Sequence, residues 1–121
     1  MAAEVSWQVR DKILLTRYQG VVTPAELVET IESIIAHMDA ATSTLHVIVD
    51  WRQTSDYPYY ADFMFPALKL LRKPHLGWIV LVGESGTLKI WVQLFARVSD
   101  FRYQIVPTPE AALEFLQDKV M

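Results

Sequence analysis

Two short apolar runs constrain the fold of this chain more than any other feature. They are Leu45 to Trp51 and Gly77 to Gly83, and in both of them apolar residues occupy consecutive positions. Neighbouring side chains of a strand point to opposite faces of a sheet, so both faces of these two strands need a cover. Strands of this kind are typical of parallel sheets that lie beneath helices. The two runs therefore predict parallel strands inside an α/β fold.

The segments around these runs alternate between extended and helical patterns. Thr23 and Pro24 predict a helix start, with a capping side chain followed by proline at the first helical position, and this helix extends to about Ala40. Its apolar positions recur at helical spacing, which predicts a buried face made of Leu27, Val28, Ile31, Ile34, Ile35 and Met38. The remaining strands and helices are expected at residues 5–9, 13–19 (ended by Gly20), 85–99, 102–106 and from 108 onward, with another helix between the two apolar runs.

The order β-β-α-β-α-β-α-β-α predicts a single mixed, mostly parallel five-stranded sheet with an antiparallel first strand and about four helices. A length of 121 residues suits one domain, spanning residues 1–121. The net charge of −3 argues against nucleic-acid binding. The basic cluster of Lys69, Arg72 and Lys73 is typical of a helix C-terminus. No apolar run is long enough for a transmembrane segment and the first residues do not resemble a signal peptide, so we expect a cytoplasmic protein.

An aromatic segment follows the first apolar run and is the most informative candidate site. Over residues 51–66 it contains Trp51, Tyr57, Tyr59, Tyr60, Phe63 and Phe65. Loops normally carry polar turn residues, so a loop this aromatic has two interpretations. Either it folds back as a cover over the core, or it forms a surface for a ligand or a partner, where amphipathic aromatic side chains are favoured.

Catalysis has little support in the sequence. Asp50 and Glu84 are placed at strand ends, yet no nucleophile or histidine is visibly paired with either of them. The residues Gly-Glu-Ser-Gly at 83–86 match neither a nucleophile elbow nor a phosphate-binding loop. The histidines, His37, His46 and His75, show no metal-ligand spacing. We therefore expect no catalytic residue, no metal and no cofactor.

The order and spacing of these features resemble the SpoIIAA-like proteins of the STAS superfamily, in the branch also compared with CRAL-TRIO lipid-transfer domains. The resemblance covers nearly the whole chain. Its residues are Gly20 and Thr23 before the first long helix, the strand VIVDW ending at Asp50-Trp51, Gly77-Trp78, Val82-Gly83-Glu84, the helix with Leu88, Trp91 and Phe95, and Ala111-Ala112-Leu113. The resemblance implies a regulator that binds partner proteins.

Family members of this kind are switched by phosphorylation of a serine in an Asp-Ser-Ser-Gly-like turn after the third strand. This chain has Gln53-Thr54-Ser55-Asp56 near that place, with neither the glycine nor the serine pair. Thr54 and Ser55 are therefore weak candidates for phosphoacceptors, and we expect no phosphorylation switch.

The function expected from these observations is a non-enzymatic regulatory or protein-interaction module of the STAS type, with an unknown protein partner. The alternative is a carrier or sensor of a small apolar, lipid-like molecule held under the aromatic segment. Sequential strands would place the crossover helices on one face of the sheet, leaving the other to the aromatic segment or to a second subunit. We therefore expect a homodimer, with Trp91 and Phe95 as a further apolar surface for the contact.

Overall fold

Five strands form the sheet, and their order across it follows their order along the chain. The computed structural model describes residues 3–120. The first strand pairs antiparallel with the second, and all later pairs are parallel. The strands are β1 (Ala3–Val9), β2 (Ile13–Val21), β3 (Leu45–Asp56), β4 (Leu76–Val82) and β5 (Arg102–Val106). The mixed sheet predicted from the sequence is confirmed.

Four α-helices and two short 3₁₀ helices connect or follow the strands within the described residues. They are α1 (Pro24–Ala40), η1 (Tyr60–Asp62), α2 (Met64–Leu71), α3 (Gly86–Ala96), α4 (Pro109–Leu116) and η2 (Gln117–Lys119). Side-chain caps explain where three of them begin. The backbone amide of Glu26 donates to the Thr23 hydroxyl over 3.2 Å, and Ser85 and Thr108 cap α3 and α4 in the same way.

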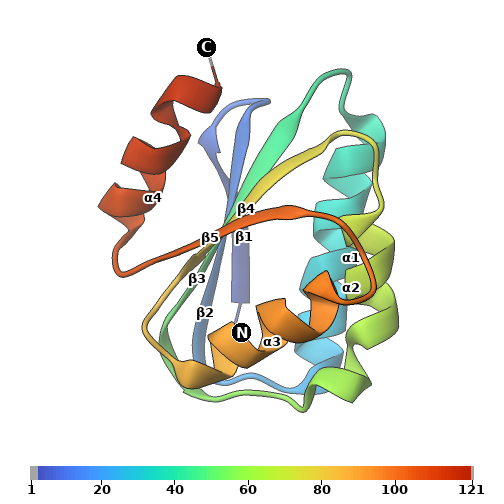
Figure 1. The fold of residues 1–121 in the computed structure, drawn as a ribbon, viewed down its shortest axis with the longest axis vertical. Coiled ribbons are helices and arrows are strands. Elements are labelled where there is room, and N and C mark those ends of the chain that lie inside the picture. Colours follow the sequence, from blue (N-terminus) through green and yellow to red (C-terminus); the bar gives the residue numbers. More distant parts are fainter. Residues whose placement is uncertain (1–2, 121) are drawn as a thin grey trace.

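The helices divide between the two faces of the sheet. Figure 1 shows α1 and α2 on one face, where the side chains of α3 also pack, and α4 alone on the other. Each of α1, α2 and α3 joins two neighbouring parallel strands, and right-handed crossovers that proceed in one direction place their helices on one face. Because no described strand follows α4, this restriction does not apply to it.

Two hydrophobic cores result. The larger core lies between the sheet and α1, α2 and α3, and it contains Leu14, Val47 and Leu81 from the strands. The smaller core lies beneath α4, where Ala112 and Leu116 are fully buried. From the sheet, the smaller core takes Ile13, Leu15, Ile48, Val80, Val82 and Val106.

Two expectations about the sheet are corrected. The face opposite the crossover helices, expected to be left to the aromatic segment or to a second subunit, is covered by α4. In addition, Gly20 does not end β2, because the strand continues to Val21. Gly20 adopts a left-handed φ of 66°. The pairing of β2 with β3 shifts register immediately after this glycine, so it marks an irregularity inside the strand and not a terminus.

Candidate functional site

The aromatic segment is not the single loop that its composition predicted. Its first residues continue β3 as far as Asp56, because β2 extends beside them and pairs Gln19 with Gln53 and Gly20 with Thr54. A short loop and η1 follow, and α2 begins at Met64. The segment is therefore anchored at one end by a sheet ladder and at the other by a helix.

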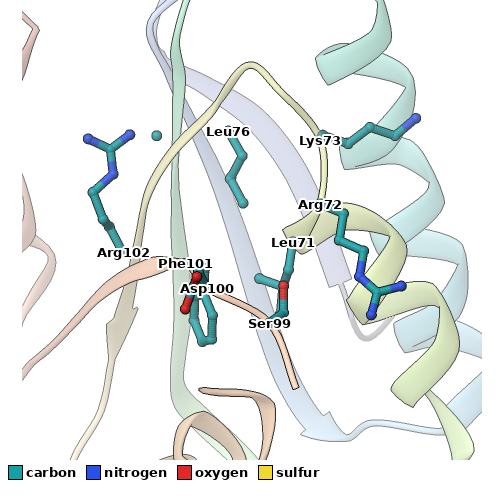
Figure 2. A pocket seen from close by; sticks show the side chains of 9 residues that line it. Leu71, Arg72, Lys73, Leu76, Ser99, Asp100, Phe101 and Arg102 are labelled. Atoms are coloured by element: carbon teal, nitrogen blue, oxygen red, sulfur yellow. The ribbon is translucent and has the colours of Figure 1, made fainter. Parts of the chain in front are cut away.

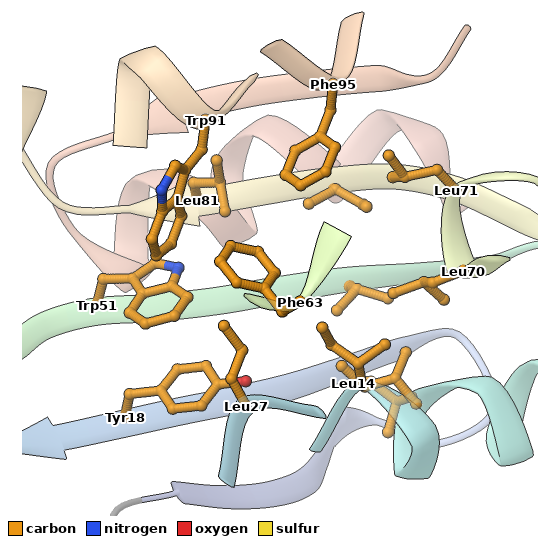
Figure 3. Packing of buried hydrophobic residues seen from close by; sticks show 14 of the residues in the cluster. Leu14, Tyr18, Leu27, Trp51, Phe63, Leu70, Leu71, Leu81, Trp91 and Phe95 are labelled. Atoms are coloured by element: carbon orange, nitrogen blue, oxygen red, sulfur yellow. The ribbon is translucent and has the colours of Figure 1, made fainter. Parts of the chain in front are cut away.

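Part of the segment fills the larger core. Trp51 and Phe63 are each only 4% exposed, and Tyr57 is half-buried. The Trp51 ring stacks on Tyr18 with ring centres 4.2 Å apart, and Trp91 meets it edge-on at 5.2 Å. Figure 3 shows these rings together with Phe63, which lies 4.9 Å from Trp91. This part of the segment covers the core, which is one of the two interpretations that the sequence left open.

The other part of the segment points into solvent. Tyr59 is 66% exposed and Phe65 is 77% exposed. Phe65 lies beside Pro66 and Lys69 in an open hollow between α1 and α2, which Glu32 and Ile35 also line. The side chain of Tyr60 lies outside the part of the structure that is described. Two large aromatic side chains are thus exposed on a well-anchored segment, and their role as a ligand or partner surface stays a prediction.

Trp91 and Phe95, expected as a surface for self-association, lie inside the larger core. They are 7% and 8% exposed, and both contact Phe63. Their spacing of one helical turn is the same for a buried face as for an exposed one, so the sequence pattern alone did not separate the two cases. In this conformation neither side chain is available to a partner.

A cavity of about 100 Å³ lies within the larger core. The sheet, α1, α2 and α3 all contribute to its wall, including Val49, Trp51, Phe63 and Ala67. The indole nitrogen of Trp51 is buried and has no hydrogen-bond partner among the described residues.

Tyr18 also lines the cavity, and its hydroxyl is already bonded. It contacts the Thr30 hydroxyl, which in turn donates to the carbonyl oxygen of Leu27 over 2.9 Å. Burial raises the pKa of Tyr18 to about 12, although the bond to Thr30 opposes this shift. Tyr18 therefore stays neutral and offers little free hydrogen-bonding capacity to the cavity.

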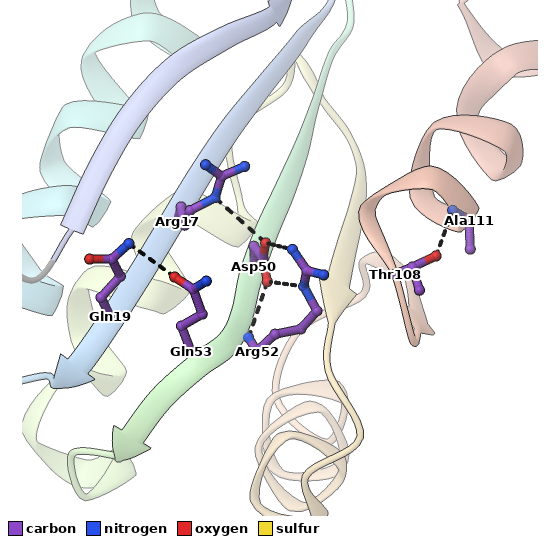
Figure 4. A network of polar contacts seen from close by, with 7 residues as sticks. All are labelled: Arg17, Gln19, Asp50, Arg52, Gln53, Thr108 and Ala111. Atoms are coloured by element: carbon purple, nitrogen blue, oxygen red, sulfur yellow. Dashed lines mark hydrogen bonds and ion pairs between the residues drawn. The ribbon is translucent and has the colours of Figure 1, made fainter.

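Asp50 is the best-connected carboxylate in the described chain. It lies on the α4 face of the sheet, where Arg52 donates to both of its oxygens over 3.0 and 2.9 Å (Figure 4). The backbone amide of Arg52 adds a third bond at 3.1 Å, and Arg17 lies 3.7 Å away. Burial alone would raise the pKa of Asp50, but the bonds from Arg52 and the charge of Arg17 outweigh it and lower this pKa.

This arrangement suits a structural ion pair. A carboxylate whose pKa is lowered and whose oxygens are occupied is a poor proton donor or acceptor near neutral pH. Glu84, the other candidate carboxylate, is exposed, and no described hydrogen bond or ion pair joins it to Asp50. No group of three or more histidine, aspartate or glutamate side chains in the described residues is arranged to hold a metal.

Thr54 and Ser55 lie in the last residues of β3 and not in a turn. The hydroxyl oxygen of Thr54 is buried and has no described hydrogen-bond partner, whereas Ser55 is exposed. The three histidines have different surroundings. His37 packs against the edge of Trp7 at 5.4 Å, and the half-exposed His75 precedes β4. His46 is buried at the amino end of β3, where its two nitrogens contact the amide of Trp78 and the carbonyl of Lys119.

No protein-family model matches this chain, and no curated protein matches it. Solved structures do. The anti-sigma factor antagonist SpoIIAA, in its unphosphorylated form, is similar with a TM-score of 0.68 and 18% identity, over 96% of this chain and 98% of that one. A Shewanella loihica protein of the DUF3478 family, described as having a SpoIIAA-like fold, is similar with a TM-score of 0.63 and 12% identity, over 95% and 92% of the chains.

These comparisons show that the chain has the SpoIIAA-like fold expected from the sequence. Identities this low show the fold alone. The expected relationship to CRAL-TRIO domains stays a prediction. Among the described residues, no helix combines the length and the apolar character that crossing a bilayer requires.

Proposed function

We propose that this chain is a non-enzymatic regulatory module of the STAS type, formed by a single domain over residues 1–121 and acting in the cytoplasm by binding a partner protein. The observation that supports this most directly is the pair of exposed aromatic side chains, Tyr59 and Phe65, on a segment anchored by Trp51 and Phe63. A rigidly held aromatic residue offers a large contact area with little loss of conformational entropy. The similar fold of an anti-sigma factor antagonist adds to this proposal.

The surroundings of Asp50 and Glu84, the two candidate carboxylates, support a non-enzymatic role. Arg52 donates to both oxygens of Asp50, and no described hydrogen bond or ion pair joins the exposed Glu84 to Asp50. A binding module needs no acid–base pair, whereas a hydrolase or transferase of this size would need converging polar groups around one reacting atom.

The test compares two double variants that each replace two exposed apolar side chains. Tyr59→Ser with Phe65→Ser alters the proposed surface, and Ile90→Ser with Val98→Ser alters exposed apolar residues elsewhere (57% and 54%). Cross-linking in the native host followed by mass spectrometry should lose a specific partner only with the first pair. Melting temperatures of both variants should stay close to that of the wild type, since exposed residues are replaced. Equal partner recovery by both variants would reject Tyr59 and Phe65 as the binding surface.

A homodimer remains part of the proposal, with the exposed aromatic pair as its contact in place of the buried Trp91 and Phe95. Sedimentation over micromolar concentrations tests it. A mass equal to one chain at every concentration would reject the homodimer, and the proposed partner would then be a different protein.

The cavity supports a second candidate function, a carrier or sensor of a small apolar molecule held under the aromatic segment. The supporting observation is the 100 Å³ apolar hollow beside Trp51 and Phe63. Native mass spectrometry of the protein purified from its host should then detect a bound species of low mass. A single mass equal to that of the chain alone would count against this function.

A further inference from the structure

The outer edge of β5 carries backbone groups that no other part of the described chain engages. β5 is the last strand of the sheet and pairs only with β4. The carbonyl oxygen of Val106 accepts from the amide of Gly83 over 2.9 Å, so the backbone groups of Val106 point toward β4. Successive residues of a strand turn these groups to opposite sides, so Gln104 also points inward, whereas Tyr103 and Ile105 turn their amides and carbonyls outward. No described hydrogen bond reaches these outward groups.

β5 is also the more regular of the two edges of the sheet. Proteins commonly protect an edge strand with a bulge, which twists it away from further pairing. The opposite edge, β1, has such an irregularity, because its pairing with β2 shifts register between Trp7 and Val9. The pairing of β5 with β4 runs without a shift from Arg102 to Val106. Figure 1 shows the ribbon of β5 crossing the front of the sheet with no other element drawn over it. β5 is therefore the edge that is open to a further strand.

We propose that two copies of this chain pair through β5, antiparallel to each other about a twofold axis at Gln104. The inference rests on the proposed homodimer and places its contact at the sheet edge in place of Tyr59 and Phe65, which then stay available to the partner protein. In this register Tyr103 of each copy exchanges amide and carbonyl hydrogen bonds with Ile105 of the other, so every outward group gains a partner. The two sheets become one continuous sheet with a closed, twofold contact.

The central side chains of β5 are complementary to themselves in this register. Tyr103 and Ile105 lie on the face of the sheet that α1, α2 and α3 cover, and both are only half-buried. The contact brings each tyrosine ring against a β-branched side chain, which is a favourable cross-strand pair. On the other face, the exposed Gln104 lies opposite Gln104 of the second copy, and each amide can donate to the other and accept from it. A second copy therefore fits this edge on both faces.

The charged residue of β5 is also compatible with the contact. Arg102 lies opposite Val106 of the second copy, so the two arginines stand at opposite ends of the paired strands and like charges do not face each other. Figure 2 shows the Arg102 side chain directed away from Phe101. Its guanidinium carbon lies 5.9 Å from the ring centre of Trp78 in β4, on the α4 face.

A disulfide across the twofold axis tests the register. The chain has no cysteine, so Gln104→Cys introduces a single thiol. An antiparallel pair of this kind, which exchanges no backbone hydrogen bonds, has Cα atoms about 4.5 Å apart, within the roughly 4.4–6.8 Å that a disulfide spans. Mild oxidation at micromolar concentration should therefore convert most of Gln104→Cys into a covalent dimer. Arg102→Cys is the matched control, exposed on the same strand and face, and it should stay mainly uncross-linked because its counterpart lies at the far end of the contact.

A proline tests the backbone hydrogen bonds of the same contact. Ile105→Pro removes an outward amide that the pairing with β4 does not use, so the sheet of each copy keeps its own hydrogen bonds. Each dimer loses two cross-edge bonds, so its dissociation constant should rise roughly 25-fold, a factor of about five for each lost bond. Sedimentation measures this change, and circular dichroism confirms the fold. Should Ile105→Pro fail to fold, the two cysteine variants still decide the matter.

The outcomes separate this inference from the homodimer on which it rests. A wild-type dimer in sedimentation, with no more cross-linking in Gln104→Cys than in Arg102→Cys, would overturn the β5 contact and retain the homodimer. Loss of that dimer in the variant with Tyr59→Ser and Phe65→Ser would then assign its contact to the aromatic pair. A single chain at every micromolar concentration would overturn both the contact and the homodimer. The results expected are a wild-type dimer, cross-linking specific to Gln104→Cys and a weaker dimer in Ile105→Pro.

Discussion

Replacement of Gly77 by alanine should destabilise this protein far more than the same replacement at any other glycine. A Cβ atom at Gly77 would lie 2.5 Å from Cε1 of His46, closer still to its Nδ1, and 2.8 Å from Cγ2 of Thr44. Contacts below 3.0 Å are not tolerated, so His46 must move. It cannot move freely, because it is buried and its Nδ1 accepts the backbone amide of Trp78 over 2.9 Å.

The size of the effect follows from these two contacts. Displacing His46 leaves the Trp78 amide and the ring nitrogen without partners, which costs about 1–3 kcal/mol. Crowding in a packed region adds about 1–3 kcal/mol. The free energy of unfolding should therefore fall by roughly 2–6 kcal/mol, the combined range of these two terms.

Urea unfolding of Gly77→Ala against Gly86→Ala measures this effect with a matched control. Gly86 begins α3, and a Cβ there meets no atom within 4 Å, so alanine should be neutral or stabilising by up to about 1 kcal/mol. In a His46→Ala background, Gly77→Ala should lose most of its cost. Equal stability of Gly77→Ala and the wild type, or an undiminished cost in the His46→Ala background, would refute the reasoning.

Further predictions concern protonation, the core and modification. Burial lowers the pKa of His46, so the unfolded chain binds a proton at a higher pH than the native protein does. Stability should therefore be fully present above about pH 6.5 and fall as the pH drops below it, by up to about 1.4 kcal/mol per pH unit, and His46→Gln should flatten this slope in urea titrations. Ile34→Asp should cost about 4 kcal/mol or more by placing an unpaired charge in the core, whereas the exposed Ala36→Asp should change stability little. Thr54 and Ser55 should carry no stoichiometric phosphate in protein from the native host, and its detection by mass spectrometry would contradict this.

Local signals in the sequence were sufficient for most of the fold. Thr23 and Pro24 start α1 where predicted, because capping depends on neighbouring residues alone. The apolar runs at β3 and β4 identified the centre of the sheet, because only strands buried on both faces tolerate them. The strand over Arg102–Val106 also has its predicted bounds.

Features that depend on residues distant in the sequence could not be predicted from the local sequence pattern. Residues 52–56 are polar and resemble a loop, yet they are strand because β2 extends beside them. The face that α4 covers is decided by the packing of Leu116, and no local signal gives it. The split of the aromatic segment into buried Phe63 and exposed Phe65 arises where η1 meets α2. The cavity likewise results from the way in which several elements fill space.

The position of α4 also matters while the chain is being made. Ile13, Ile48 and Val80 form one apolar face as soon as β2, β3 and β4 can pair, but their cover arrives only when Ala112 and Leu116 have been synthesised. Domains begin to fold during translation, and exposed apolar sheet surface makes partly folded chains prone to aggregation. A nascent chain that has left the ribosome as far as β5 therefore presents an uncovered apolar face that chaperones can hold. Release from them should coincide with emergence of α4.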